Sequence, residues 1–302
     1  MKYFMIFVSI FLFVLSNIAS ARVHDYMSTR LKSTAGTGVG SLLLNESNLL
    51  NPAPLAFFGF STINFQKGRL ETNQAQDRGF TQENYKSHSG TTSLTIADAN
   101  DQFKGAVGYY DKKEGIEERQ RYAFSYGIPV AKMTSIGFTV RHSREKNNFY
   151  GDRLVTDNYT QTILGTTHAI NEQFTVGFVA IDPLRTKKED TIGIVGFQYL
   201  VKNILALMLD FGVDPLAEET SESLLYRGAM QLNLFSDFYA RGGISTNKKL
   251  GEKGTGFGIA WVGPKLALDL ALMSTKPIND PTSYLKPQEK VKESSLALTY
   301  KF

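Results

Sequence analysis

The chain of 302 residues contains no cysteine, only one tryptophan and nine prolines, and four histidines in separate segments. The absence of cysteine excludes a disulfide framework, a thiolate site and a lipid anchor on a cysteine. Beyond residue 21 there is no run of about 18 apolar residues, which excludes a membrane-spanning helix there. A net charge of +4 without a long basic run gives no reason to expect nucleic acid as a partner. Glycine, phenylalanine and tyrosine are plentiful instead, and the mean hydropathy is −0.19.

The first 21 residues have the three parts of a secretory signal peptide. Met1 and Lys2 form a short positively charged start, residues 3–18 are almost wholly apolar, and residues 19–21 (Ala-Ser-Ala) form a small-residue cleavage site. We expect cleavage after Ala21 and export from the cytoplasm. The alternative is an uncleaved signal anchor, which the shortness of the apolar run disfavours.

The last nine residues have the pattern of a strand with one apolar face. Leu296, Leu298, Tyr300 and Phe302 alternate with small or polar residues, as expected for side chains that point to opposite faces of a strand. A terminal strand frays unless it is paired on both sides, and closure of a sheet into a barrel supplies the second partner. The tail resembles the C-terminal signature of bacterial outer-membrane barrels, which implies that Tyr300 and Phe302 form a barrel-closing signal for the barrel-assembly machinery. The alternative is the last strand of a soluble β-domain.

Alternating segments recur after Pro54 and are joined by connections that are long and short in turn. The short ones, such as 201–202, span a few residues, whereas the long ones, such as 182–190, are polar and charged. This alternation is typical of outer-membrane barrels, which have short turns on the periplasmic side and long loops outside. A soluble β-sandwich gives no reason for it. The candidate strands are 55–66, 91–98, 103–111, 119–128, 134–145, 158–168, 173–181, 191–200, 203–212, 223–234, 237–245, 255–263, 265–275 and 294–302.

The sequence therefore predicts an all-β protein, a transmembrane antiparallel up-and-down barrel of about 14 strands over residues 55–302, in the lipid bilayer of the bacterial outer membrane. Glycines within the strands allow two interpretations. They mark either bulges or kinks at which the wall opens sideways, or close packing against the hatch or against aromatic neighbours. These glycines are Gly105, Gly108, Gly193, Gly196, Gly242 and Gly243.

Residues 22–54 lack the strand pattern and are predicted to form a hatch inside the barrel. A fourteen-stranded barrel is wider than an eight-stranded one, whose interior is filled by side chains, so its lumen needs an apolar element to seal it. Residues 42–54 are the apolar stretch available outside the strands, and Pro52 and Pro54 give it a rigid end. The alternative is a periplasmic tail. The candidate hatch and ligand residues are Leu49, Leu50, Asn51, Pro52 and Ala53.

The stretch from Gly36 to Phe57, GTGVGSLLLNESNLLNPAPLAF, resembles the N-terminal segment of FadL-type outer-membrane proteins. In that family a Gly-rich stretch, a short apolar segment and an Asn-Pro-Ala motif precede the first strand. The resemblance implies a fourteen-stranded barrel whose N-terminal segment folds into the lumen as a hatch. It also implies passage of hydrophobic compounds, such as long-chain fatty acids, across the outer membrane. The short connection at 129–133 departs from the family, because it has no room for the helical insertions of longer members.

Several charged residues fall on the inward face of the predicted strands. A ring of inward arginines could hold a ligand carboxylate, because a guanidinium binds a carboxylate with two hydrogen bonds. The alternative is a solvated lining in which these residues pair with Asp and Glu. The inward charged residues are Arg121, Arg141, Arg227, Arg241, Lys265 and Asp269.

No catalytic constellation stands out in the sequence. His142-Ser143 is the nearest approach to a base and nucleophile, but alternation places His142 on the lipid side, and the histidine spacing fits no metal site. We therefore expect no enzymatic activity, no cofactor and no metal. The functional hypothesis is an outer-membrane channel for passive uptake of small hydrophobic or amphipathic, fatty-acid-like compounds, gated by the hatch. The alternatives are a structural or adhesive barrel and a general diffusion porin.

Overall fold

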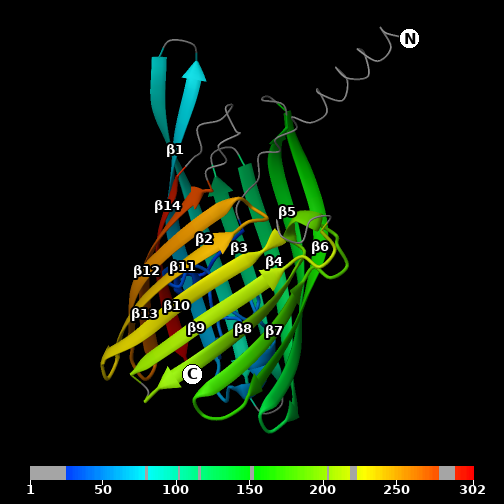
Figure 1. The fold of residues 1–302 in the computed structure, drawn as a ribbon, viewed down its shortest axis with the longest axis vertical. Helices are drawn as coiled ribbons and strands as arrows, with labels where there is room; N and C mark the ends of the chain where they lie inside the picture. Colours follow the sequence, from blue (N-terminus) through cyan, green and yellow to red (C-terminus); the bar gives the residue numbers. More distant parts are fainter. Residues whose placement is uncertain are drawn as a thin grey trace.

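The computed structural model describes residues 25–78, 81–100, 103–114, 117–149, 153–202, 204–217, 223–278 and 290–302, so the predicted signal peptide lies outside the described residues. Fourteen antiparallel strands form one closed barrel, in which each strand pairs with its neighbours along the chain and the last pairs with the first (Figure 1). The predicted fold class is therefore confirmed. The strands are β1 (Thr62–Arg78), β2 (Thr81–Ala99), β3 (Lys104–Glu114), β4 (Glu117–Ala131), β5 (Thr134–Phe149), β6 (Arg153–Ala169), β7 (Phe174–Ile181), β8 (Ile192–Val201), β9 (Leu205–Val213), β10 (Leu225–Phe235), β11 (Phe238–Asn247), β12 (Glu252–Val262), β13 (Leu266–Pro277) and β14 (Val291–Lys301).

The residues that alternate along each strand in the sequence alternate between exposed and buried positions in the structure. On β14, Ala297 and Thr299 point inward and are buried, whereas Leu296, Leu298 and Tyr300 are 44–48% exposed on the outer surface. An apolar outer face of this kind is what a barrel presents to lipid. No helix in the described part of the chain has the length and apolar character required to cross a bilayer.

The seam between β14 and β1 closes the barrel without a break. The register runs from Thr62 opposite Lys301 to Thr72 opposite Val291. Beyond it, Phe302 N donates to Ser61 O (3.0 Å) and Ser61 N donates to Phe302 O (3.1 Å). The C-terminal residues therefore lie where the expected closing strand places them. Recognition of Tyr300 and Phe302 by the assembly machinery stays a prediction.

The strand ends differ from the prediction at the long connections. Residues 53–57 form a 3-10 helix, η1 (Ala53–Phe57), and the first strand begins at Thr62 rather than at residue 55. Residues 67–90, expected as a loop, largely belong to a hairpin in which β1 and β2 stay paired as far as Arg78 and Thr81 (Figure 1). The apolar face ends well before the strands do, because a ladder needs backbone hydrogen bonds rather than apolar side chains. We call this end of the barrel the long-loop end and the opposite end the short-turn end.

Residues 25–61, the luminal segment, fold inside the barrel (Figure 1). The segment contains helix α2 (Thr29–Ser33), whose N-cap Ser28 accepts a hydrogen bond from Leu31 N (3.1 Å), followed by turns and then η1. Its apolar side chains pack against the inner wall in two cores. Each buried leucine contributes about 1.5–3 kcal/mol relative to water, so the six together hold the segment in the lumen. They are Leu31, Leu43, Leu44, Leu49, Leu50 and Leu55.

Glycines on the inner wall make room for the backbone of the luminal segment. Gly127, Gly137 and Gly165 lie in register on β4, β5 and β6. A Cβ atom at Gly137 would lie 2.7 Å from Pro52 C and from Ala53 N, which no side chain can do. These three glycines therefore form a flat patch on which the Asn-Pro-Ala turn rests.

Two further glycine pairs serve the same purpose. Gly177 and Gly196 are partners on β7 and β8, and Gly243 and Gly256 are partners on β11 and β12. A Cβ atom at Gly196 would lie 2.5 Å from Gly40 N, and one at Gly243 would lie 2.8 Å from the Cα atom of Thr34. The wall thus carries three glycine patches, and the luminal segment touches all of them.

Of the two interpretations of the strand glycines, sideways opening is wrong at β3. Its ladder with β2 runs unbroken from Thr91–Lys112 to Ala99–Lys104, and its ladder with β4 is also unbroken. The packing interpretation holds for Gly108, Gly196 and Gly243, which face the luminal segment. Gly193 and Gly242 fit neither interpretation, because a Cβ atom there would meet nothing closer than 3.8 Å. Gly105 lies against the ring of Phe103, which agrees with packing against an aromatic neighbour.

Candidate functional site

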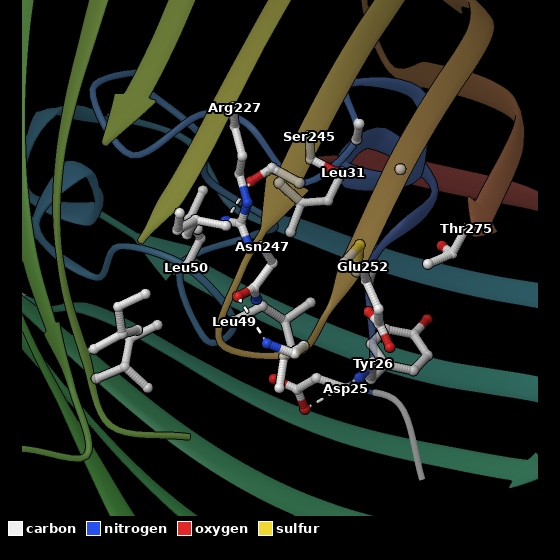
Figure 2. A pocket seen from close by; sticks show the side chains of 18 of the residues that line it. Asp25, Tyr26, Leu31, Leu49, Leu50, Arg227, Ser245, Asn247, Glu252 and Thr275 are labelled. Atoms are coloured by element: carbon white, nitrogen blue, oxygen red, sulfur yellow. Dashed lines mark hydrogen bonds between the residues drawn. The ribbon is translucent and has the colours of Figure 1, made fainter. Parts of the chain in front are cut away.

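A cavity of about 370 Å³ lies between the luminal segment and the long-loop end (Figure 2). Its volume falls within the range of small-molecule sites, about 300–1,000 Å³. The walls are largely apolar, with a few polar groups that converge on the space, as in sites that bind a ligand with an apolar body. The apolar lining includes Leu31, Leu49, Leu50, Ile192, Ile194 and Leu225, and the polar lining includes Asp25, Arg227, Asn247 and Glu252.

The predicted hatch residues divide into two groups. Leu49 and Leu50 line the cavity, and both are buried. Asn51 lies beneath it and fixes the turn: its Nδ2 donates to Val39 O (2.9 Å) and to Thr167 Oγ1 (3.0 Å). Pro52 and Ala53 rest on the wall at Gly137. The first group can contact a ligand, whereas the second anchors the segment.

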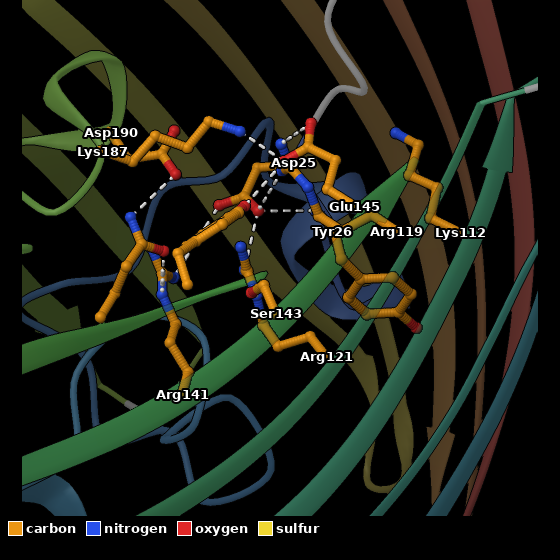
Figure 3. Close-up of polar contacts among 12 residues, drawn as sticks. Asp25, Tyr26, Lys112, Arg119, Arg121, Arg141, Ser143, Glu145, Lys187 and Asp190 are labelled. Atoms are coloured by element: carbon orange, nitrogen blue, oxygen red, sulfur yellow. Dashed lines mark hydrogen bonds and ion pairs between the residues drawn. The ribbon is translucent and has the colours of Figure 1, made fainter. Parts of the chain in front are cut away.

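A buried cluster of arginines and carboxylates borders the cavity on the side of β4 and β5 (Figure 3). Asp25 accepts hydrogen bonds from Arg119 Nη1 (3.2 Å) and Arg121 Nη1 (2.8 Å). Glu145 accepts from Arg119 Nη2 (2.9 Å) and pairs with Lys187. Because its arginines are paired with carboxylates, this cluster is an ion network rather than a ring of free guanidinium groups.

The other predicted inward charges are mostly where alternation places them. Arg141 Nε donates to Gln161 Oε1 (3.0 Å), and its Nη1 lies 4.0 Å from Asp25 Oδ2. Arg241 forms an ion pair with Asp269. Of the two readings of these charges, pairing with acidic residues is therefore the one that the contacts favour. These residues line the lumen as the alternation predicts.

Arg227 and Lys265 behave differently from the rest. Arg227 lines the cavity and donates from Nη1 to Gly36 O (3.0 Å), and Figure 2 shows it beside Leu31 and Leu50. Lys265 is exposed in the turn that precedes β13 and does not face the lumen. The prediction for Lys265 is wrong because the strand begins at Leu266, so the alternation was extended one residue too far.

Sequence reasoning missed the acidic partners. Glu145 shares the parity of Arg141 on β5, so alternation places it in the lumen and could have identified it. Glu293 on β14 pairs with Lys32 of α2 (3.0 Å) and with Lys112 of β3 (3.3 Å). No pattern in the sequence points to Asp25, because its position depends on how the luminal segment lies in the barrel.

Burial changes the ionisation of the charged groups on the luminal segment. It lowers the pKa of Lys32, although Glu293 acts in the opposite direction. It also lowers the pKa of Arg30 to about 10. It raises the pKa of the Glu46 carboxyl, a change that Arg30 and the hydrogen bond from Ser28 Oγ (3.0 Å) oppose without cancelling. Glu46 therefore takes up a proton more readily in the seated segment than in water.

We expect the seating of the luminal segment to depend on pH through Glu46. Because the pKa of Glu46 is raised in the folded state, its protonation favours the seated form below the ordinary carboxyl value of about 4.3. That contribution is lost as pH rises through the raised pKa. The protection of the luminal segment against hydrogen exchange should therefore decrease as pH rises over this window, and Glu46→Gln should flatten the dependence. A matched Glu71→Gln variant, at an exposed position on β1, should leave it unchanged; an equal effect of both variants would contradict the assignment.

The described residues hold no cluster of histidine and acidic side chains that could bind a metal ion. The described residues thus form a closed fourteen-stranded barrel with an N-terminal segment packed in its lumen and a cavity beside that segment. No protein-family model and no curated protein sequence matches the chain.

The fold is nonetheless similar to solved channel structures. The CymD monoaromatic hydrocarbon channel has a TM-score of 0.66 at 11% identity, over 90% of this chain and 96% of CymD. The Ralstonia pickettii toluene transporter TbuX has a TM-score of 0.63 at 11% identity, over 91% and 98%. A Pseudomonas aeruginosa FadL homologue has a TM-score of 0.61 at 12% identity, over 93% and 99%. At this level of identity the likeness establishes the fold.

Proposed function

We propose that this chain is an outer-membrane channel for passive uptake of small hydrophobic or amphipathic compounds, gated by its luminal segment acting as a hatch. The observation that carries the proposal is the cavity of about 370 Å³, which combines leucine and isoleucine walls with Arg227. The structures with the same fold are described as a hydrocarbon channel and a toluene transporter, so a ligand with an apolar body is the class to test first. A fatty-acid-like ligand adds a carboxylate that Arg227 would hold.

The cellular setting follows from the same proposal. The signal peptide would take the chain out of the cytoplasm, and the C-terminal strand with Tyr300 and Phe302 would present the closing signal to the assembly machinery. The apolar outer face would then lie in the lipid of the outer membrane. No catalytic step and no cofactor is part of this function.

Planar-bilayer conductance separates the proposed channel from its alternatives. The intact protein should be silent, because the luminal segment fills the lumen, and deletion of residues 22–53 should produce steady ion conductance. Steady conductance of the intact protein would instead identify a general diffusion porin. Silence of both proteins, together with no uptake of ligand into proteoliposomes, would leave a structural or adhesive barrel.

We expect the role of Arg227 to show in a comparison of two ligands. Arg227→Met should weaken binding of a fatty acid by about 1.5–3 kcal/mol, roughly 10- to 150-fold, because it removes a charged hydrogen-bond donor. Binding of toluene should stay within about twofold, since a neutral hydrocarbon makes no such bond. Binding can be followed by the displacement of a fluorescent apolar probe from the purified protein.

Leu50→Asn is the matched control for this comparison, because Leu50 lies beside Arg227 in the cavity wall (Figure 2). Leu50→Asn should weaken the binding of both the fatty acid and toluene, since it replaces apolar surface by an amide. If Arg227→Met weakened the binding of both ligands equally, Arg227 would support the site through its hydrogen bond to Gly36 O and would not contact the ligand carboxylate.

A further inference from the structure

The outer wall carries a groove across β12, β13, β14 and β1, which are consecutive neighbours in the barrel (Figure 1). The groove has a volume of about 600 Å³. It lies on the surface that an outer-membrane barrel presents to lipid, and most of the side chains that line it are apolar. These apolar side chains are Phe257, Ile259, Leu270, Leu272 and Leu296.

A small side chain creates the recess. Ser294 on β14 points outward, opposite Leu272 of β13 on one side and Arg69 of β1 on the other. Both neighbours are larger than serine, so the surface is lower between them. A second depression of about 500 Å³ also contains Ser294 and continues the groove toward the long-loop end. Its lining there changes to Glu71, Thr255, Ser274, Lys290 and Lys292.

The outward side chains of these four strands change from apolar to basic toward the long-loop end. On β1, for example, the outward residue after Phe65 is Lys67. Among the described outward side chains of the four strands a single one is acidic, Glu71, which lies 3.5 Å from Arg69. Five exposed basic residues, which we call the basic band, stand against it. They are Lys67, Arg69, Lys253, Lys276 and Lys292.

Basic residues farther around the barrel are neutralised within the chain. Lys113 of β3 and Lys146 of β5 both pair with Glu118 of β4, at 3.6 Å and 3.0 Å. No such pair involves the lysines of the basic band among the residues that the structure describes. The positive charge beside the groove is therefore available to a partner outside the chain.

The arrangement of apolar groove and basic band matches a lipid with a phosphorylated head group. The groove lies where acyl chains would pack, and the basic band lies at the end of the apolar surface, where long basic side chains reach the head groups. Four neighbouring strands span about 14 Å at about 4.8 Å between adjacent strands, so the band is wider than one phosphate group. A head group with more than one phosphate matches this width.

We propose that the groove binds a lipid of the outer leaflet whose head group carries more than one phosphate. Its acyl chains would lie over Ser294, and Lys67, Arg69 and Lys292 would hold the phosphates, Arg69 with two hydrogen bonds. The proposal rests on the outer-membrane setting of the proposed function and is independent of transport. It assigns a ligand to the outside of the wall, whereas the cavity beside the luminal segment lies inside.

Native mass spectrometry of the purified protein with added lipid tests the site. Diphosphoryl lipid A should bind at least tenfold more tightly than phosphatidylglycerol, which has a single phosphate, and more tightly still than phosphatidylcholine. A variant that combines Lys67→Gln, Arg69→Gln and Lys292→Gln should bind lipid A about 100-fold more weakly, because each basic residue near anionic lipid strengthens binding roughly fivefold. Equal binding of lipid A and phosphatidylglycerol would overturn the assignment of the head group.

The matched control removes the same charge elsewhere on the outer wall. It combines Lys113→Gln, Arg144→Gln and Lys146→Gln, all at outward positions of β3 and β5. This variant should bind lipid A within about threefold of the unmodified protein. If the two triple variants weakened binding equally, net charge rather than the basic band would attract the lipid, and the proposed site would be wrong.

Filling the groove is a test that leaves the basic band intact. Ser294→Trp should weaken lipid A binding at least tenfold, because the larger side chain occupies the space of the acyl chains. Leu298→Trp is the control on the same strand, since Leu298 is exposed outward but lies outside the groove, and it should change nothing. Circular dichroism should show that both variants keep the barrel. Unchanged binding by Ser294→Trp would overturn the groove as the site.

Two further outcomes are separable from these. A dimer in the same spectra that Ser294→Trp dissociates would mean that a second copy of the chain covers the groove, which contradicts a lipid there. If the protein binds lipid A at the groove but takes up neither toluene nor a fatty acid, the proposed function fails and the lipid site stands. If it takes up ligand but binds lipid A no more tightly than phosphatidylcholine, the function stands and the lipid site is wrong.

Discussion

Gly243→Val should open the barrel to ions. A side chain at Gly243 would place its Cβ atom 2.8 Å from the Cα atom of Thr34, so the end of α2 cannot keep its seat on β11 and β12. The strand itself should tolerate valine, which favours extended backbone. Single-channel recordings should therefore change from silence to frequent openings, the largest functional effect that we expect from one substitution in the wall.

The neighbouring residue supplies the control for this prediction. Gly242 lies on the opposite face of β11, where an added Cβ atom would meet only Gly256 O at 4.0 Å. Gly242→Val should therefore leave the channel silent. If both variants conducted equally, loss of strand glycine in general, and not displacement of α2, would be the cause.

Glu145→Gln should be the most destabilising substitution in the charged cluster. Glu145 is fully buried and pairs with Arg119 and Lys187, while Arg121 and Arg141 lie close by. Removing its charge leaves Lys187 without this carboxylate partner and Arg119 with Asp25 alone, and breaking a buried ion pair in this way lowers the free energy of unfolding by about 3–5 kcal/mol. Urea unfolding of the barrel in lipid vesicles, followed by the fluorescence of Trp261, should show this decrease in the free energy of unfolding.

Glu118→Gln is the matched control on the adjacent strand. Glu118 pairs with Lys113 and Lys146, both of which are more than one-third exposed, so the change should cost no more than about 1 kcal/mol. A double variant, Arg119→Met with Glu145→Met, should recover much of the lost free energy of unfolding, because it removes both charges of the pair together. If Glu145→Gln lowered the free energy of unfolding no more than Glu118→Gln does, the buried cluster would not contribute to the stability of the barrel.

The strand pattern could be predicted well because it is local. Whether Leu298 faces lipid and Ala297 the lumen follows from the period of two, and the same rule placed Arg121, Arg141 and Asp269 correctly. The rule gave poorer results at strand ends. At Lys265 and over residues 67–90 the side-chain pattern and the backbone ladder do not end at the same residue.

The candidate site could be predicted only in part. The residues of the Asn-Pro-Ala turn were identified from their apolar, Pro-containing sequence, and Leu49 and Leu50 do line the cavity. The acidic partners of the arginines were not identified. Asp25 is about 94 residues from Arg119 in the chain, and no spacing rule connects positions so far apart.

The sequence by itself determined the number of strands, the side of the wall on which most side chains lie, the closing seam at β14 and β1, and the stretch available to seal the lumen. Each of these depends on neighbouring residues or on the sum of apolar surface along the chain. Only the tertiary structure decided which glycines accommodate the luminal segment, which carboxylates pair with Arg119 and Arg121, and where the cavity beside that segment lies. These features depend on how one segment is seated against strands that are distant in sequence, and that position is set by packing inside the closed barrel.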